Sequence, residues 1–150
     1  EKKIVIRQTG DTLIAALDND QFVCMNNLHV LTLKDDSLTL EYILAIVNSK
    51  LMDYYHSLLN PEKGEALAEV KKENLEKLPI KILSDQEQAP FIDIVSKIHA
   101  ATSASEMSVL EQKLDLLVYQ LYGVPFDSIR LIDPAFTGMN EEDKRDTIQA

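Results

Sequence analysis

The most regular hydrophobic pattern in the chain runs from Leu40 to Leu58 and predicts a helix. Apolar residues recur there at helical spacing and fall on one side, which indicates a buried face. The members of this stripe are Leu40, Leu44, Val47, Leu51, Tyr55 and Leu58. Thr39 is placed to cap the helix N-terminus. Asn48 interrupts the stripe, so we expect its amide to bond backbone of a neighbouring strand or loop.

The residues before this helix predict short strands. Four β-branched or apolar runs are separated by turn-forming residues, which is typical of an antiparallel meander. The runs are Lys2–Arg7, Leu13–Leu17, Phe22–Met25 and Leu28–Leu33. Cys24 lies in the third run and is expected to be a buried core thiol.

The residues after the helix predict an extended segment and then more helices. Leu78–Leu83 is apolar and contains a proline, which favours extended backbone. Ser84 and Glu87 have capping-box spacing, but Pro90 conflicts with a regular start, so we expect a distorted first turn or a start near Ala89.

A second helical stripe continues to Leu121, where Gly123 and Pro125 predict the helix end. We expect one more short helical turn over 127–132. The polar residues from Pro134 to Ala150 are expected to be weakly ordered.

These patterns predict an α+β fold: a small antiparallel or mixed sheet packed on a central helix over 39–58, followed by a C-terminal α-hairpin. We divide the chain at residue 83. Residues 1–83 hold the strands and central helix. Residues 84–150 form a helical tail, with the hairpin over 86–122, a short helix and a polar C-terminus.

The charge of the chain excludes a basic nucleic-acid-binding module. The net charge is −10, with nine Lys/Arg against thirteen Asp/Glu in residues 1–80 and six against twelve in residues 81–150. Affinity for nucleic acid comes largely from Lys and Arg that neutralise phosphates. Any nucleic-acid role therefore requires a local basic patch or a partner domain.

The composition also bears on the compartment. The single cysteine cannot form an internal disulfide, no apolar run approaches the roughly 20 residues of a membrane span, and no signal peptide is visible. We therefore expect a cytoplasmic protein without a membrane partner. Because the chain begins at Glu1 without Met, we expect a processed or trimmed piece.

Several segments together resemble a known family. They are Lys3–Arg7, Leu17-Asp18, Tyr42–Leu51 with its Asn48-Ser49-Lys50 triplet, and Leu75 through Leu78-Pro79-Ile80. In this order they are similar to the TaqI-like specificity domain, the target recognition domain of type IIG restriction enzymes and related adenine methyltransferases. The helix opened by Glu87-Gln88 resembles specificity subunits of type I systems, and Leu114–Gly123 resembles the segment that closes many type IIG chains.

This resemblance covers most of residues 3–132 and implies a function. The chain would be the second half of a recognition domain plus its helical tail, because the family usually has further strands before the segment that matches Lys3–Arg7. It would read double-stranded DNA for a bacterial restriction–modification enzyme. The methyltransferase and nuclease domains, with S-adenosylmethionine and Mg²⁺, would belong to the parent enzyme outside this chain. No cofactor is expected in the chain itself.

A short list of residues could contact DNA. Lys and Arg could neutralise phosphates, and Arg7 or Gln8 could reach base edges, although each could equally be a solvated side chain. The candidates are Arg7, Gln8, Thr9, Lys50, Lys63, Lys71 and Lys72. A structural motif is expected at Asn48, Ser49, Leu78 and Pro79.

The sequence supports a catalytic function less well than it supports contact with DNA. Asp133-Pro134-Ala135-Phe136 is similar to the Asp-Pro-Pro-Tyr motif of adenine methyltransferases but lacks the second proline and an upstream glycine-rich turn. Glu69-Val70-Lys71, with Asp53 as a partner, could serve a nuclease metal. The three histidines share no ligand spacing. We therefore expect no catalytic or metal-binding residues in this chain.

Two alternatives remain open at this stage. The first is a protein-interaction or assembly domain that contacts no DNA. The second is a small metal-dependent nuclease.

Overall fold

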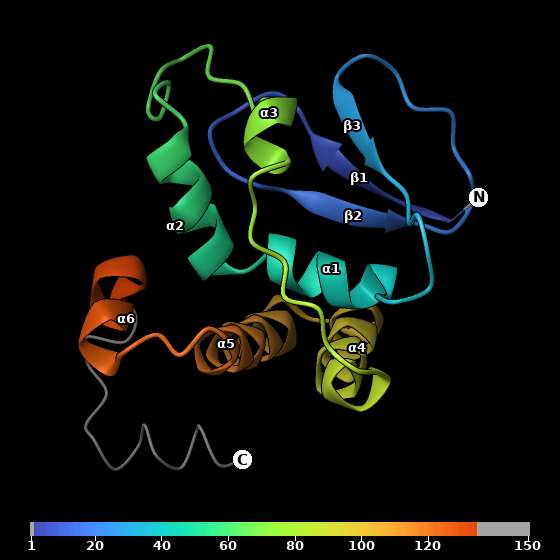
Figure 1. Ribbon diagram of the computed structural model, residues 1–150, viewed down its shortest axis with the longest axis vertical. Coiled ribbons are helices and arrows are strands. Elements are labelled where there is room, and N and C mark those ends of the chain that lie inside the picture. The colour runs from blue at the N-terminus through green and yellow to red at the C-terminus, as the bar shows by residue number, and fades with distance from the viewer. Residues whose placement is uncertain (1, 135–150) are drawn as a thin grey trace.

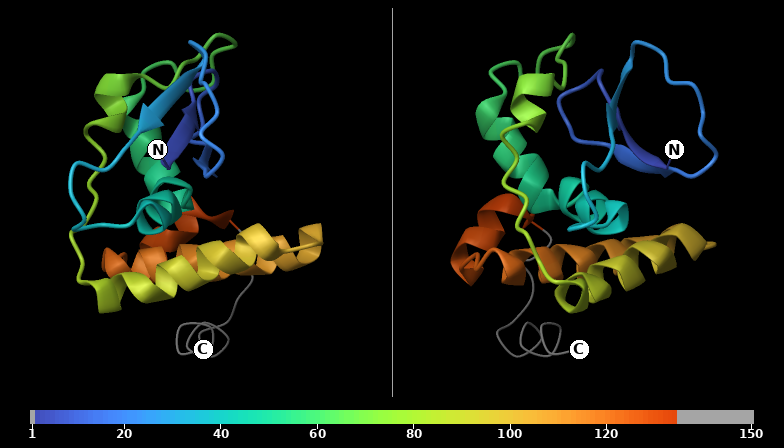
Figure 2. Two further views of the ribbon diagram at one scale, coloured as in Figure 1. Left: turned by 90° about the vertical axis from the view of Figure 1, so that its right-hand side faces the viewer. Right: turned by 45° about the vertical axis from the view of Figure 1, so that its right-hand side comes forward.

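The computed structural model describes residues 2–134 and has the expected α+β architecture. Helix α1 lies between a three-stranded antiparallel sheet and a hairpin of two long helices (Figures 1 and 2). The strands are β1 (Lys3–Arg7), β2 (Ala15–Asp18) and β3 (Leu28–Leu31). The helices are α1 (Leu40–Val47), α2 (Lys50–Leu59), α3 (Lys72–Leu75), α4 (Asp85–Ala100), α5 (Ala104–Leu121) and α6 (Phe126–Ile132).

The sheet is antiparallel but is not a meander. The strand order is β2-β1-β3, so β1 lies in the middle and pairs with both neighbours. Val5 is opposite Ala16 on one side and opposite Val30 on the other. A central place suits β1, because Ile4 and Ile6 point into the core and are almost completely buried. The predicted meander, in which the first strand would lie at an edge of the sheet, is wrong.

The run from Phe22 to Met25 is not a strand. It belongs to the connection between β2 and β3, and its side chains are exposed: 69% for Phe22, 94% for Val23 and 79% for Met25. Cys24 is half-buried in this loop rather than buried in the core. Local β-propensity does not make a strand where no neighbouring strand offers a ladder of hydrogen bonds.

The predicted central helix is divided in two. Helix α1 ends with Asn48 as its C-cap, and α2 begins after Ser49, whose backbone is extended at φ −71° and ψ 150°. The buried Ser49 hydroxyl donates to the carbonyl of Ile46 at 2.7 Å and accepts from the N–H of Met52 at 3.2 Å. Ser49 thus caps a new helix, as serine commonly does.

The division changes which side chains are buried. Helix α1 is buried on nearly every side. Its uninterrupted apolar run from Tyr42 to Val47 is typical of a helix inside the core. The inward residues of α2 are instead Met52 and His56. Tyr55 and Leu58, which were predicted to be core residues, are 37% and 67% exposed because the break turns the stripe away from the core.

The segment from Leu78 to Leu83 is extended, as predicted, and two tyrosine hydroxyls hold it. Tyr42 donates to the carbonyl of Lys81 at 2.9 Å, and Tyr122 donates to the carbonyl of Pro79 at 2.5 Å. Leu78 packs against the core. This segment therefore passes along the hairpin without a strand partner.

The predicted α-hairpin is confirmed, but its first helix starts earlier than Pro90 suggested. The Ser84 N–H and hydroxyl both bond the Glu87 carboxylate, and the helix is regular from Asp85 although Pro90 lies inside it. This capping box satisfies the first turn, so the proline removes only the bond that its own missing N–H would have made.

The end of α5 also follows the sequence. Gly123 has φ +62°, the left-handed backbone expected of a helix-terminating glycine. The short helix predicted over 127–132 is present as α6. Weak order was predicted from Pro134 to Ala150. Apart from Pro134, these residues lie outside the part of the chain that the structure describes.

One hydrophobic core joins the sheet, α1 and the hairpin. Ile4 and Ile6 of β1, the buried face of α1, Phe91 of α4 and Leu114 and Val118 of α5 belong to the same cluster. Tyr42 and Phe91 meet edge to face, with their ring centroids 5.4 Å apart. The division at residue 83 stays a prediction about domains.

Candidate nucleic-acid interface

Two loops and the last residues of a third lie at the end of the sheet where β1 finishes and β3 starts (Figure 1). The N–H of Gln8 donates to the carbonyl of Asn27 at 3.0 Å, and the N–H of Val70 donates to the carbonyl of Gln8 at 2.7 Å. The N–H of Gly10 donates to the carbonyl of Ala68 at 2.8 Å. These bonds place residues 8–14 and 60–71 beside Asn27, at the end of the connection that leads into β3, and we call this surface the sheet end.

Most of the DNA-contact candidates lie on the sheet end. Arg7, Gln8 and Thr9 leave β1 there, and Thr9 pairs with Glu69 of the loop over 60–71. The remaining lysines of this group are on that loop and at the start of α3. They are Lys63, Lys71 and Lys72. The fold therefore gathers residues that are more than fifty positions apart in the chain.

Arg7 is folded back over the turn that follows β1. Its Nη2 donates to the hydroxyl of Thr12 at 3.3 Å, and a Cβ on Gly10 would lie only 2.8 Å from Nη2. Gly10 has φ +106°, which also favours glycine. The guanidinium is thus supported by the turn, and it has no acidic partner among the described residues.

The lysines of the sheet end are interleaved with glutamates. Lys71 pairs with Glu62, which lowers the pKa of that carboxyl and raises the pKa of the lysine. Lys72 lies 3.6 Å from Glu76, with both side chains mostly exposed. An exposed ion pair such as Lys72–Glu76 contributes little to stability, so it can open when a phosphate competes for the lysine.

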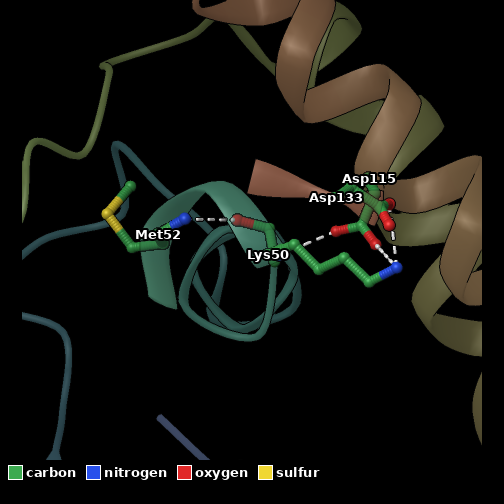
Figure 3. A network of polar contacts seen from close by, with 5 residues as sticks. Lys50, Met52, Asp115 and Asp133 are labelled. Atoms are coloured by element: carbon green, nitrogen blue, oxygen red, sulfur yellow. Dashed lines mark hydrogen bonds and ion pairs between the residues drawn. The ribbon is translucent and has the colours of Figure 1, made fainter. Parts of the chain in front are cut away.

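Lys50 lies elsewhere, at the junction of α1 and α2. Its side chain points to the helical tail, and its Nζ lies 2.8 Å from Oδ2 of Asp133 and 3.9 Å from Oδ2 of Asp115 (Figure 3). The backbone N–H of Lys50 also donates to Asp115 Oδ1 at 2.8 Å. A phosphate contact by Lys50, which stays a prediction, would compete with these two carboxylates.

The pKa of Asp115 is raised to about 6, mainly by burial; the N–H and ammonium of Lys50 oppose this rise, and the charges of Asp133 and Glu111 add to it. The side chains of Asp115 and Asp133 are only 6% and 3% exposed. Their position next to the N-terminus of α2 also suits a negative charge. Two nearly buried carboxylates therefore share one ammonium group.

The residues of the predicted structural motif make internal contacts. Asn48 Oδ1 accepts from the N–H of Ala15, and Asn48 Nδ2 donates to the carbonyl of Ala15, each at 2.9 Å. The prediction that this amide bonds the backbone of a neighbouring strand is confirmed, although Asn48 itself is exposed rather than buried in the apolar stripe.

Several polar residues organise this region in ways that were not predicted from the sequence, where Asp53 was named only as a possible metal ligand. Asp53 Oδ1 accepts from the N–H of Leu13 at 2.7 Å, which ties α2 to the first loop. Gln88 is completely buried and accepts from Thr39 at the start of α1. Asp115 had a usable signal, since it is an acid between leucines in a helix whose apolar spacing predicts burial.

In the part of the chain that the structure describes, the residues suggested for a nuclease metal site do not form such a site. Asp53 and Lys71 are engaged with Leu13 and Glu62, as described above. Residues 2–134 contain no group of three or more His, Cys, Asp or Glu side chains that could hold a metal ion. Half of the Asp133–Phe136 motif lies outside the described residues.

A family model for the TaqI-like C-terminal specificity domain matches residues 1–80. The chain belongs to this family. The match covers the sheet and helices α1 to α3, and it ends before the hairpin. A comparison with curated proteins finds no match. Among the described residues, no helix has the length and apolar character to span a membrane. Specificity domains of this family are non-catalytic. The match therefore links the chain to DNA-sequence recognition in restriction–modification enzymes.

Proposed function

We propose that this specificity domain reads the DNA target of a bacterial type IIG-like enzyme that joins an endonuclease with an N6-adenine methyltransferase. The observation that carries the proposal is the family match over the residues that build the sheet end. S-adenosylmethionine and Mg²⁺ would serve catalytic domains outside residues 1–150, in the cytoplasm. The chain contributes sequence choice and no chemistry.

The sheet end is the proposed contact surface. Arg7 and Gln8 carry side chains that can bond base edges in the major groove, where guanine and adenine offer paired hydrogen-bonding groups. Lys63, Lys71 and Lys72 would neutralise phosphates and fix the register of the domain on the duplex. Lys50 is not part of this surface.

The charge balance limits what the chain can do alone. Between residues 60 and 76 there are three lysines and five glutamates. A phosphate senses charges within a Debye length of about 10 Å at 0.1 M salt, so these glutamates weaken the local positive potential. Binding by the chain alone is therefore expected to be weak and strongly salt-dependent, with other domains of the enzyme supplying most of the affinity.

Two substitutions in the complete enzyme test the proposal. Lys71→Ala should weaken binding about equally for all DNA sequences, whereas Arg7→Ala should relax sequence choice at one position by roughly 1–3 kcal/mol. Lys97→Ala, on the exposed face of α4, is the matched control and should change neither property. Equal behaviour of all three variants and the unchanged enzyme would refute the sheet end as the reading surface.

A second candidate function is favoured by one observation. Phe22, Val23 and Met25 expose a group of apolar side chains, and such patches often mark protein–protein contacts. Together with the lysine–glutamate pairs, this supports an interaction or assembly domain without DNA contact. Unchanged DNA selection after Arg7→Ala, together with unchanged DNA affinity after Lys71→Ala, would favour this alternative.

A further inference from the structure

Helix α2 is held to the helical tail at its N-terminal end. Asp115 of α5 accepts the backbone N–H of Lys50, and the Lys50 ammonium reaches Asp133 at the end of α6. Both carboxylates are almost completely buried, whereas the Lys50 side chain is 44% exposed. Because an unpaired buried charge is costly, the two acids bind Lys50 firmly to the tail. We call these three residues the tail clamp.

Helix α2 is held to the sheet end at its other end. The N–H of Glu62 donates to Asn60 Oδ1 at 3.1 Å, and the Asn60 amide donates to the carbonyl of Glu69 at 3.4 Å. Asn60 is 3% exposed and follows the last residue of α2. Asn60 therefore joins the loop from 60 to 71 to the end of α2.

We propose that Asp115 and Asp133 are positioning residues for DNA recognition, because they fix the N-terminal end of α2 through Lys50 and α2 sets where loop 60–71 lies on the sheet end. This inference rests on the proposed function. It gives the helical tail, which lies outside the family match, a part in recognition. It also makes Lys50 an internal anchor instead of a phosphate contact.

The direction in which one substitution changes DNA affinity separates these two roles of Lys50. If Lys50 binds phosphate, Asp133→Asn frees its ammonium and removes a negative charge, so DNA binding becomes tighter. If Lys50 is an anchor, Asp133→Asn loosens α2 and binding becomes weaker. Lys50→Met gives a second distinction, because losing a phosphate contact lowers the slope of log affinity against log salt by about one.

The experiment uses the complete protein and a pool of DNA duplexes with a randomised central segment. Selection and sequencing identify the preferred site, and anisotropy titrations over a range of salt then compare Asp133→Asn, Lys50→Met and Lys50→Arg. The matched control is Asp93→Asn, which breaks the exposed Lys97 pair on α4. Hydrogen exchange of the amides between 62 and 70 reports on the loop without DNA, and melting curves verify folding.

The tail clamp predicts that Asp133→Asn and Lys50→Met each weaken binding to the selected site, on the order of three- to tenfold, with an unchanged salt slope. Exchange between 62 and 70 becomes faster, and Lys50→Arg and Asp93→Asn behave like the unchanged protein. Tighter binding by Asp133→Asn, a smaller slope in Lys50→Met, or unchanged exchange would overturn the proposal. If the unchanged protein selects no sequence, the proposed function fails, and the recognition role fails with it whatever the exchange data show.

Discussion

The side-chain amide of Asn48 forms two hydrogen bonds with the backbone of Ala15, one through the N–H and one through the carbonyl of that residue. Ala15 faces Ile6 in the register of β1 and β2, and Arg7 bonds the carbonyl of Ile14. By the alternation of antiparallel ladders, the backbone groups of Ala15 therefore point away from β1. The amide occupies the place that a further strand would take.

Replacing this amide should destabilise the fold despite the added apolar surface. Asn48→Leu leaves both backbone groups of Ala15 without a protein partner, and two hydrogen bonds contribute about 1–3 kcal/mol together. Urea denaturation of the chain measures the loss. Asn19→Leu, at another exposed asparagine near the same strand, should have little effect. A leucine variant as stable as the parent would contradict this reading of Asn48.

The break between α1 and α2 should depend on the Ser49 hydroxyl. Ser49→Ala removes an N-cap and leaves the carbonyl of Ile46 without its hydroxyl donor, so the free energy of unfolding should fall by about 1–2 kcal/mol. Ser57→Ala on α2 is the control, because its hydroxyl bonds only the carbonyl of Tyr54 in an exposed turn. Equal losses in the two variants would argue against a capping role.

Pro90→Ala should stabilise the protein. The alanine can donate a backbone hydrogen bond inside α4 that proline cannot, and Pro90 is exposed, so no core packing is lost. The gain should be about 1–2 kcal/mol after allowance for the greater freedom of the unfolded chain. A rise in the urea midpoint without a change in slope would be the expected observation. A lower midpoint would mean that Pro90 makes favourable contacts in the folded state.

His56 should make the protein less stable in mild acid. Its ring is completely buried, neither nitrogen has a hydrogen-bond partner in the described part, and burial lowers its pKa below 6.5, against the opposing charges of Asp53 and Asp11. In the window between the lowered pKa and 6.5 the unfolded chain binds more protons, so stability falls as the pH falls.

The measurement compares the free energy of unfolding at about pH 7.5 and about pH 5.5 in the parent and in His56→Leu. The variant should lose less stability between these two values. His99→Leu, at an exposed histidine of α4, should retain the slope of the parent. An identical slope in all three proteins would show that His56 is not the group responsible.

The titration of Asp115 should respond in opposite directions to its two neighbours. Asp133→Asn removes a repelling carboxylate and should lower the pKa of Asp115 from about 6, whereas Lys50→Met removes an attracting ammonium and should raise it. The carboxyl carbon shift of Asp115 in NMR spectra follows the pKa directly. Asp93→Asn should have no effect, and shifts of the same sign in the first two variants would contradict the arrangement of charges described here.

Much of the fold could be predicted from interactions between residues that are close in sequence. Helix caps at Thr39 and Ser84, the stop at Gly123 and the helical spacing of the hairpin are all effects of residues near in sequence, and these predictions hold. The break at Ser49 was missed although serine favours capping positions, because the apolar spacing continues across it and outweighed that signal.

Contacts between distant residues could not be predicted in the same way. The central place of β1 depends on which strands meet, and a list of apolar runs does not contain that information. The bonds from Lys50 to Asp115 and Asp133 span 65 and 83 positions. From the sequence Lys50 was one of several lysines that could touch DNA, and only the fold shows that two acids hold it.

The hydrophobic core that joins the sheet to the hairpin has a consequence for how specificity could be transferred between enzymes. Phe91, Leu114 and Val118 complete the core that begins with Ile4, yet the family match ends at residue 80. A gene fusion cut at that point would leave the apolar surface of α1 facing water, and it would lose the cooperativity of the folding unit. A chimera that exchanges target choice would therefore need to carry the hairpin together with the strands.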